Sequence, residues 1–222
     1  TTASSFSPYR HGGYSFGLDG ENDYITIPQT TDTDLTGDFT VECWVYFNDT
    51  AGDNGFIGKW SGSGFYAWSL YYYSGDFVFF TGNSGAVGTE TSFTFGAATA
   101  NQWYHLAVSR TGSTISLYVN GTRTNTFTDS NNCTANTTLT VGSDGTALST
   151  WSFDGYMRDV RIVNGTGLYT GTSITVPTEP LTAVTNTKFL LGDLPYFKDQ
   201  STSNHTINVY KIYNASLNRA SL

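Results

Sequence analysis

Apolar and polar residues alternate along most of this chain, and such alternation predicts β-strands. Between residues 38 and 47, Phe39, Val41 and Cys43 share one face of a strand, while Thr40 and Glu42 share the other. Sustained apolar spacing of three and four residues, which would indicate helices, is nearly absent. We therefore expect strands near residues 14–18, 23–28, 38–47, 55–60, 65–73, 76–81, 89–95, 103–110, 114–120, 122–128, 138–142, 153–163, 187–192 and 205–211.

The turns between these strands predict antiparallel pairing. Asn120-Gly121 separates two alternating segments, and Asn-Gly favours two-residue hairpins because both positions need a positive φ. Ser74-Gly75 and Thr111-Gly112 lie in similar places. So many short antiparallel strands predict an all-β, two-sheet antiparallel sandwich in one domain. The longest irregular connection, residues 166–186, is expected to run over the outside of the sandwich.

Composition excludes several classes of function. The net charge is −8, and charged residues are 13 % of the sequence, so we expect no nucleic-acid partner. Aromatic residues are 16 %, which excludes a disordered acidic tail. Because no run of eighteen apolar residues occurs, we also expect no membrane insertion. Two cysteines, Cys43 and Cys133, are too few for a disulfide framework; they form either one bridge or two unpaired buried thiols.

The residues do not predict an enzyme. Glycoside hydrolysis needs two carboxylates that flank the scissile bond, and none of the four glutamates alternates with another acid along a strand. Asp32 and Asp34 do alternate, but their surroundings indicate a loop. His105 lies within a strand and is expected to be a hydrogen-bonded core residue. A glycoside hydrolase is therefore only a remote alternative, and the histidine and cysteine spacing of a zinc site is absent.

Four segments carry a resemblance to a known family. They are YSFGLDGENDYITIP, DFTVECWVYF, QWYHLAVSRTGSTISLYVNGT and FDGYMRDVRIVNG. In order and spacing they resemble the laminin-G-like, concanavalin A-like lectin jelly-roll domain. The resemblance covers residues 14–211, which leaves an N-terminal arm at 1–13 and a C-terminal tail at 212–222.

A narrower likeness concerns the segments GTGLYTGTSITVPTEPLTAVTNTKFLL and FKDQSTSNHTINV. They are similar to the tandem version of this domain in structural proteins of tailed phages, especially marine ones. The resemblance implies a non-enzymatic fibre, tail or capsid-decorating protein on the virion surface, outside the cell. Its expected partners are a host-surface glycan, other virion proteins or further copies of itself. The alternative is a purely structural decorating or cementing role through protein contacts.

The resemblance also suggests calcium as a cofactor. Similar domains often hold this ion near the turn that contains Asp19 and Asp23, with an acid from the strand of Asp159. Here Arg158 stands where the family often has an acid. An arginine, Arg158 or Arg161, could instead pair with the acids of the turn, and we prefer this second interpretation.

Aromatic side chains are the candidates for binding carbohydrate, because sugars stack their apolar faces on such rings. Alternation places Leu70 and Tyr72 on one face of their strand, and Tyr71 and Tyr73 on the other. Filling of the core is the competing role for each ring. The predicted carbohydrate-binding residues are Trp60, Trp68, Tyr71, Tyr73 and Trp151.

Overall fold

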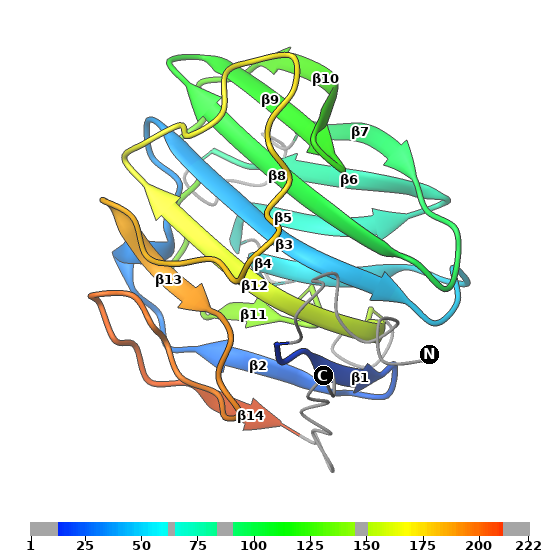
Figure 1. Ribbon diagram of the computed structural model, residues 1–222. Coiled ribbons are helices and arrows are strands. Elements are labelled where there is room, and N and C mark those ends of the chain that lie inside the picture. Colours follow the sequence, from blue (N-terminus) through cyan, green and yellow to red (C-terminus); the bar gives the residue numbers. More distant parts are fainter. Residues whose placement is uncertain (1–12, 62–64, 84–90, 145–150, 211–222) are drawn as a thin grey trace.

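The protein is a sandwich of two antiparallel sheets in a computed structural model, which describes residues 13–61, 65–83, 91–144 and 151–210 (Figure 1). Within these residues each sheet has seven strands. The predicted all-β fold is therefore confirmed. Of the predicted arm and tail, all residues except Gly13 lie outside the described residues.

The first sheet has the order β1-β12-β3-β8-β9-β10, and β13 pairs with the second half of β12. Its strands are β1 (Phe16–Asp19), β3 (Phe39–Phe47), β8 (Trp103–Thr111), β9 (Thr114–Val119), β10 (Thr122–Thr128), β12 (Asp154–Asn164) and β13 (Thr187–Leu191). The second sheet has the order β14-β2-β11-β4-β5-β6-β7. Its strands are β2 (Tyr24–Ile27), β4 (Asn54–Ser61), β5 (Phe65–Tyr73), β6 (Asp76–Thr81), β7 (Thr91–Ala97), β11 (Leu139–Val141) and β14 (Asn208–Tyr210).

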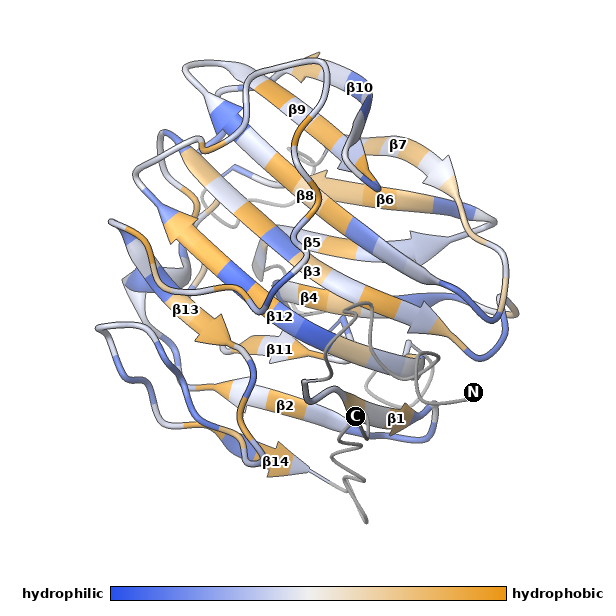
Figure 2. Cartoon of the chain, in the orientation of Figure 1, coloured by the Kyte–Doolittle hydropathy of each residue, from blue (hydrophilic) through white to orange (hydrophobic). Residues whose placement is uncertain are grey.

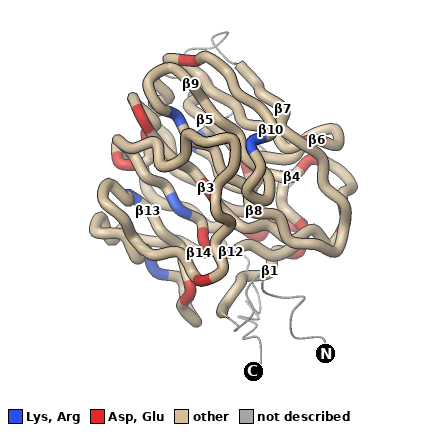
Figure 3. Tube along the Cα trace, turned by 45° about the horizontal axis from the view of Figure 1, so that its top comes forward, with Lys and Arg blue, Asp and Glu red and all other residues tan. Residues whose placement is uncertain are grey.

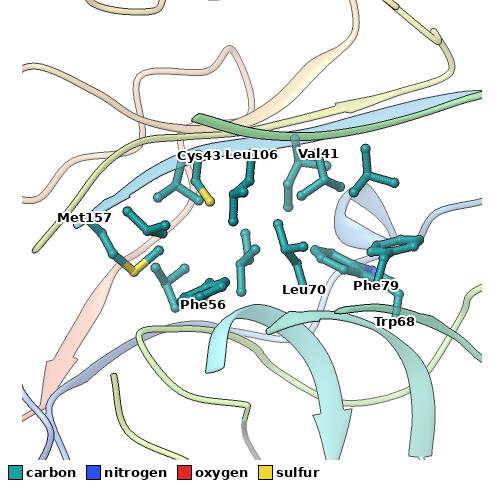
Figure 4. Close-up of a cluster of buried hydrophobic side chains, with 14 of the residues drawn as sticks. Val41, Cys43, Phe56, Trp68, Leu70, Phe79, Leu106 and Met157 are labelled. Atoms are coloured by element: carbon teal, nitrogen blue, oxygen red, sulfur yellow. The ribbon is translucent and has the colours of Figure 1, made fainter. Parts of the chain in front are cut away.

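The core lies between the two sheets, where the apolar residues of each alternating strand meet (Figures 2 and 4). Phe47 of β3 makes edge-to-face contacts with rings of the opposite sheet, at centroid distances of 5.8 Å to Phe56 and 5.1 Å to Tyr72. Each such aromatic pair contributes about 0.5–1.5 kcal/mol beyond its buried area. The interlocked rings therefore fix the stacking of one sheet on the other.

The outer face of the first sheet is covered by residues 166–186, which we call the strap. In Figure 1 this gold segment crosses in front of β8 and β3. The backbone N–H of Leu168 donates to Thr40 Oγ1 at 2.9 Å, and that of Tyr169 to Ser109 Oγ at 3.1 Å. The Tyr118 hydroxyl donates to the carbonyl of Gly171 at 2.8 Å. The connection thus runs outside the sandwich as predicted, and the polar face of β3 is buried beneath it.

The two cysteines do not form a disulfide bridge. Cys43 and Cys133 are both buried and unpaired. Of the two alternatives that the sequence left open, a bridge or two unpaired thiols, the structure shows the second. Burial raises the pKa of the Cys133 thiol to about 12. No helix among the described residues is long and apolar enough to cross a membrane.

The Asn120-Gly121 hairpin joins β9 and β10, as the sequence predicts. Both residues have positive φ, +48° and +82°. The N–H of Asn120 donates to the carbonyl of His105 at 2.9 Å, and the Asn120 side chain accepts from the N–H of His105 at the same distance. The turn therefore also ties β8 to this end of the sheet.

Replacing Asn120 tests this geometry. Asn120→Pro removes the N–H and cannot adopt a positive φ, so we expect it to lower the free energy of unfolding by ~2–4 kcal/mol. Asn120→Asp keeps an acceptor and tolerates the conformation, and we expect a loss of less than about 1 kcal/mol. Urea unfolding of the two variants measures the difference. Equal stabilities would contradict the hairpin.

Candidate functional site

The outer face of the second sheet carries a cluster of aromatic rings, which we call the aromatic face. Its members come from β4, β5, β6 and the segment after β11: Trp60, Tyr66, Tyr71, Tyr73, Phe80 and Trp151. The cluster contains four of the five residues predicted to bind carbohydrate. It lies on the side of the molecule opposite the strap (Figure 1).

The strand register explains why these rings point outward. Trp68 and Leu70 of β5 point into the core, and Tyr71 and Tyr73 point out. Alternation predicts the division into two faces but leaves open which face is buried. Between Trp68 and Tyr66 the pairing with β4 shifts by one residue, at Ala67. Such a bulge inverts the alternation beyond it. Tyr66 therefore joins the outer face, and this residue is missed by reasoning from strict alternation.

The rings pack against one another and leave one edge of the cluster exposed. Trp60 stacks on Phe80 at 4.5 Å between centroids, and Tyr66 meets Trp60 edge-on at 5.2 Å. Tyr73 and Trp151 are 5.7 Å apart with their planes only 2° from parallel. Tyr73 is 49 % exposed, so this parallel pair is the part of the aromatic face most open to solvent.

Carboxylates lie near the end of the aromatic face that carries Tyr71 and Tyr73. Burial raises the pKa of the Tyr71 hydroxyl, and the nearby Tyr73, Asp144 and Asp53 raise it further, against a hydrogen bond with Ser92 that lowers it. Asp53 also accepts a hydrogen bond from the N–H of Ser74, at 3.4 Å. The site thus combines open aromatic rings with acidic acceptors.

A glycine fixes the position of Trp151. The N–H of Gly55 in β4 donates to the carbonyl of Trp151 at 2.9 Å. A Cβ at position 55 would collide with the backbone of Ser143 and Asp144, so only glycine allows this close approach. The rigid sheet therefore holds both the ring of Trp151 and the segment of Asp144 in place.

The prediction for Trp68 is wrong. This side chain is fully buried in the core, and its Nε1–H donates to the carbonyl of Thr33 at 2.9 Å (Figure 4). Thr33 belongs to a short 3-10 helix, Thr31–Thr33, where the sequence predicts a loop. The neighbouring acids Asp32 and Asp34 are engaged in ion pairs, with Lys188 at 3.2 Å and Lys59 at 2.5 Å.

The three candidate calcium ligands do not converge. Asp19 and Asp23 share a turn, where Asp23 accepts a hydrogen bond from the N–H of Asp19 at 3.1 Å. Asp19 lies opposite Asp154 in the register of β1 and β12. Asp159 lies farther along β12, at a bulge with φ of +49°, and pairs with Arg158 at 2.8 Å.

Among the described residues, neither Arg158 nor Arg161 forms an ion pair with an acid of that turn, so the second interpretation is also wrong. Arg158 forms ion pairs with Asp159 and, at 3.6 Å, with Asp193. Arg161 pairs with Glu42. Across residues 13–61, 65–83, 91–144 and 151–210, no group of three or more His, Cys, Asp or Glu side chains is arranged to hold a metal ion.

Glu42 is the centre of a buried polar network under the strap. Its carboxylate accepts hydrogen bonds from His105 Nε2 at 3.1 Å, Arg161 Nε at 2.9 Å and the Tyr169 hydroxyl at 3.0 Å. Burial opposes ionisation of Glu42, but the bond to His105 and the charge of Arg161 outweigh it and lower its pKa below 4.5. His105 is a hydrogen-bonded core residue, as predicted.

The comparison with known families agrees with this architecture. A model described as the concanavalin A-like lectin/glucanases superfamily matches residues 19–168, more than half of the chain. The chain belongs to this superfamily. The laminin-G-like, concanavalin A-like resemblance is thereby confirmed. No curated protein sequence matches significantly.

Solved structures with the same fold are distant in sequence. A putative carbohydrate binding protein from Bacteroides ovatus aligns with a TM-score of 0.61 at 15 % identity, over 90 % of this chain and 59 % of that chain. The SAP-like pentraxin from Limulus polyphemus gives 0.53 at 14 %, over 71 % and 78 %. Botulinum neurotoxin type C, whose cell entry depends on interaction with two ganglioside molecules, gives 0.52 at 16 %, over 70 % and 39 %. The chain thus spans less than two thirds of the first of these proteins.

In this concanavalin A-like domain, we expect the Glu42 network to dominate acid sensitivity. Glu42→Gln leaves the buried Arg161 without its counter-charge, so the free energy of unfolding should fall by ~3–5 kcal/mol at pH 7. Because the pKa of Glu42 is lowered on folding, its contribution is complete above pH about 4.5 and is lost as the pH falls through the folded-state value. Urea unfolding from pH 7 to pH 3 should show that the difference in free energy of unfolding between the unmodified protein and Glu42→Gln becomes smaller.

Glu179→Gln is the matched control, because Glu179 is an exposed residue of the strap. Its stability should follow the unmodified protein within about 0.5 kcal/mol at every pH. A gap for Glu42→Gln that stays constant down to pH 3 would contradict the assigned ionisation.

Proposed function

We propose that this domain is a non-enzymatic glycan-binding module that holds a saccharide on the aromatic face. The observation that carries the proposal is the parallel pair of Tyr73 and Trp151, with Tyr73 half exposed. Sugars present apolar C–H faces that stack on such rings. Asp53, next to the rings, supplies an acceptor that orients sugar hydroxyl groups.

The relatives support a role in carbohydrate recognition. The Bacteroides ovatus structure is a putative carbohydrate binding protein, and the neurotoxin structure concerns gangliosides. Both are too distant in sequence to transfer a site, so the argument for the aromatic face rests on its own geometry. Because the neurotoxin structure concerns gangliosides in cell entry, we infer that the partner of this domain is a glycan on a cell surface.

We further propose that the domain works outside the cell, on the surface of a phage particle, in a fibre, tail or decorating protein. This part rests on the likeness of the strap and the segment after β13 to domains of phage structural proteins, and the structures named above do not bear on it. A weakly charged exterior rich in Thr, Ser and Asn suits such a setting.

Alanine substitutions of the parallel pair, Tyr73 and Trp151, test glycan binding. A glycan array with the whole chain identifies a ligand, and calorimetry measures its dissociation constant. Tyr73→Ala and Trp151→Ala should each weaken binding about five- to tenfold, the equivalent of ~1 kcal/mol from a lost stacking contact. Tyr73→Ala should leave the unfolding midpoint nearly unchanged.

Tyr196→Ala is the matched control, since this tyrosine is 57 % exposed and outside the aromatic face. It should bind like the unmodified protein. If a ligand is found and all three variants bind it equally, the aromatic face is not the site. If no glycan binds, the proposal fails as a whole.

A second candidate function is assembly through the end of the second sheet. β14 is the last described strand on that side, and Val209 and Tyr210 are 43 % and 42 % exposed. A strand at the edge of a sheet is a template for pairing with another chain. This observation favours contact with a further copy of the protein.

Light scattering over a range of concentrations tests the edge. If copies pair at β14, the mean mass should rise with concentration, and Val209→Lys should abolish the rise because edge lysines block strand pairing. Val184→Lys is the control, at a residue of the strap that is 41 % exposed. A monomer at all concentrations would contradict the assembly role.

A further inference from the structure

A second concave site lies on the opposite side of the sandwich, between the strap and the hairpins of the first sheet. It is a groove of about 260 Å³, lined by Thr111, Thr114, Ser116, Arg123, Tyr169 and Thr170. Pockets for drug-sized ligands measure roughly 300–1,000 Å³. The groove therefore has room for one small unit, such as a single monosaccharide.

The strap forms a preorganised wall of this groove. The N–H of Arg123 donates to the carbonyl of Thr172 at 3.0 Å, and the N–H of Ile174 donates to that of Gly121 at 2.8 Å. Tyr169 is held at both ends, since its hydroxyl binds the buried Glu42 and its ring meets Tyr118 at 6.0 Å. A wall that is fixed before binding loses little conformational entropy when a ligand arrives.

The residues that line the groove carry several hydroxyl groups and one positive charge. Hydroxyl groups come from Thr111, Thr114, Ser116 and Thr170, and Ser116 forms part of the buried end of the groove. Arg123 is the sole basic residue of β10, where Figure 3 shows an isolated blue segment. Such a set matches a ligand with several hydroxyl groups and one anionic group.

Arg123 has donors to spare. Its Nη1–H donates to the carbonyl of Thr170 at 3.2 Å, and no carboxylate among the described residues forms an ion pair with it. By contrast, Arg158 and Arg161 are buried and engaged with acids. The chain has a net charge of −8, so most of its electrostatic field is negative. The guanidinium of Arg123 provides a positive charge at this groove.

We infer that the groove binds an anionic saccharide unit, one that carries a carboxylate or a sulfate ester, with its acidic group on Arg123. Two oxygens of either group match the planar fork of a guanidinium, and the neighbouring hydroxyl groups pair with those of the sugar ring. The site lies on the other sheet from the aromatic face and does not depend on the function proposed for that face. Together the two sites would let one domain contact glycan on both sides.

Titration of the isotope-labelled whole chain, followed by amide chemical shifts at low ionic strength, tests the groove. The probes are sodium glucuronate, glucose 6-sulfate, neutral methyl glucoside and inorganic sulfate. Shifts at Thr114, Ser116 and Arg123 should saturate at least about tenfold tighter with an acidic sugar than with methyl glucoside. Saturation by glucuronate alone or by the sulfated sugar alone supports the proposal and identifies the anionic group.

Three variants complete the experiment. Arg123→Gln should reduce binding of the acidic sugar about tenfold, to the level of the neutral one, and Arg123→Lys should recover it only in part because the fork is lost. Lys198→Gln removes the same charge from an exposed position beyond β13 and should change nothing. A thermal midpoint for Arg123→Gln close to that of the unmodified protein shows that folding is intact.

Several results would contradict the proposed saccharide site in the groove. Acidic and neutral sugars with equal dissociation constants, or shifts that map away from the groove, would overturn the site. Inorganic sulfate that binds as tightly as the acidic sugars would overturn the saccharide assignment. Equal losses in Arg123→Gln and Lys198→Gln would show a general charge effect instead of a site. Failure of the aromatic-face variants has no bearing on any of these outcomes.

Discussion

The buried carboxylate of Glu42 is the interaction on which the outer half of the structure depends. It lies on β3 and accepts hydrogen bonds from β8, β12 and the strap, through His105, Arg161 and Tyr169. A carboxylate without partners at this depth would cost several kcal/mol, so the three donors are a condition for burying it. Because they come from different elements, satisfying Glu42 also fixes the strap on the first sheet.

This coverage makes the two sides of the sandwich chemically different. The strap seals polar residues of the first sheet and, with Arg123 and the hairpins, encloses a hydroxyl-lined groove. The second sheet instead presents the aromatic face, which ends in the open pair of Tyr73 and Trp151. A single core thus supports the two surfaces that we propose to bind saccharide, one through apolar ring faces and the other through an acidic group.

Irregularities in the strands decide where the chemistry is displayed. The register shift at Ala67 brings Tyr66 to the aromatic face, and Gly55 admits the segment that carries Trp151. The bulge at Asp159 interrupts the pairing of β12 with β3, and the acid is used there to hold Arg158 and the N–H of Leu181. Asp159 is thus engaged away from Asp19 and Asp23, and the calcium site that the family resemblance implied is not formed by these three acids.

The sequence by itself determined the strands, the Asn120-Gly121 hairpin and the outside course of residues 166–186, because alternation and turn chemistry are local properties. It also placed Tyr71 and Tyr73 on one face. Tertiary structure alone decided that the face of Trp68 and Leu70 is the buried one. It also decided that Tyr66 lies on the opposite face, since one extra residue in a strand, here Ala67, reverses every side chain beyond it. The partners of Glu42 are 63 to 127 residues away along the chain, so no spacing could reveal them. For the same reason the groove at Arg123, built from two hairpins and the strap, exists only in three dimensions.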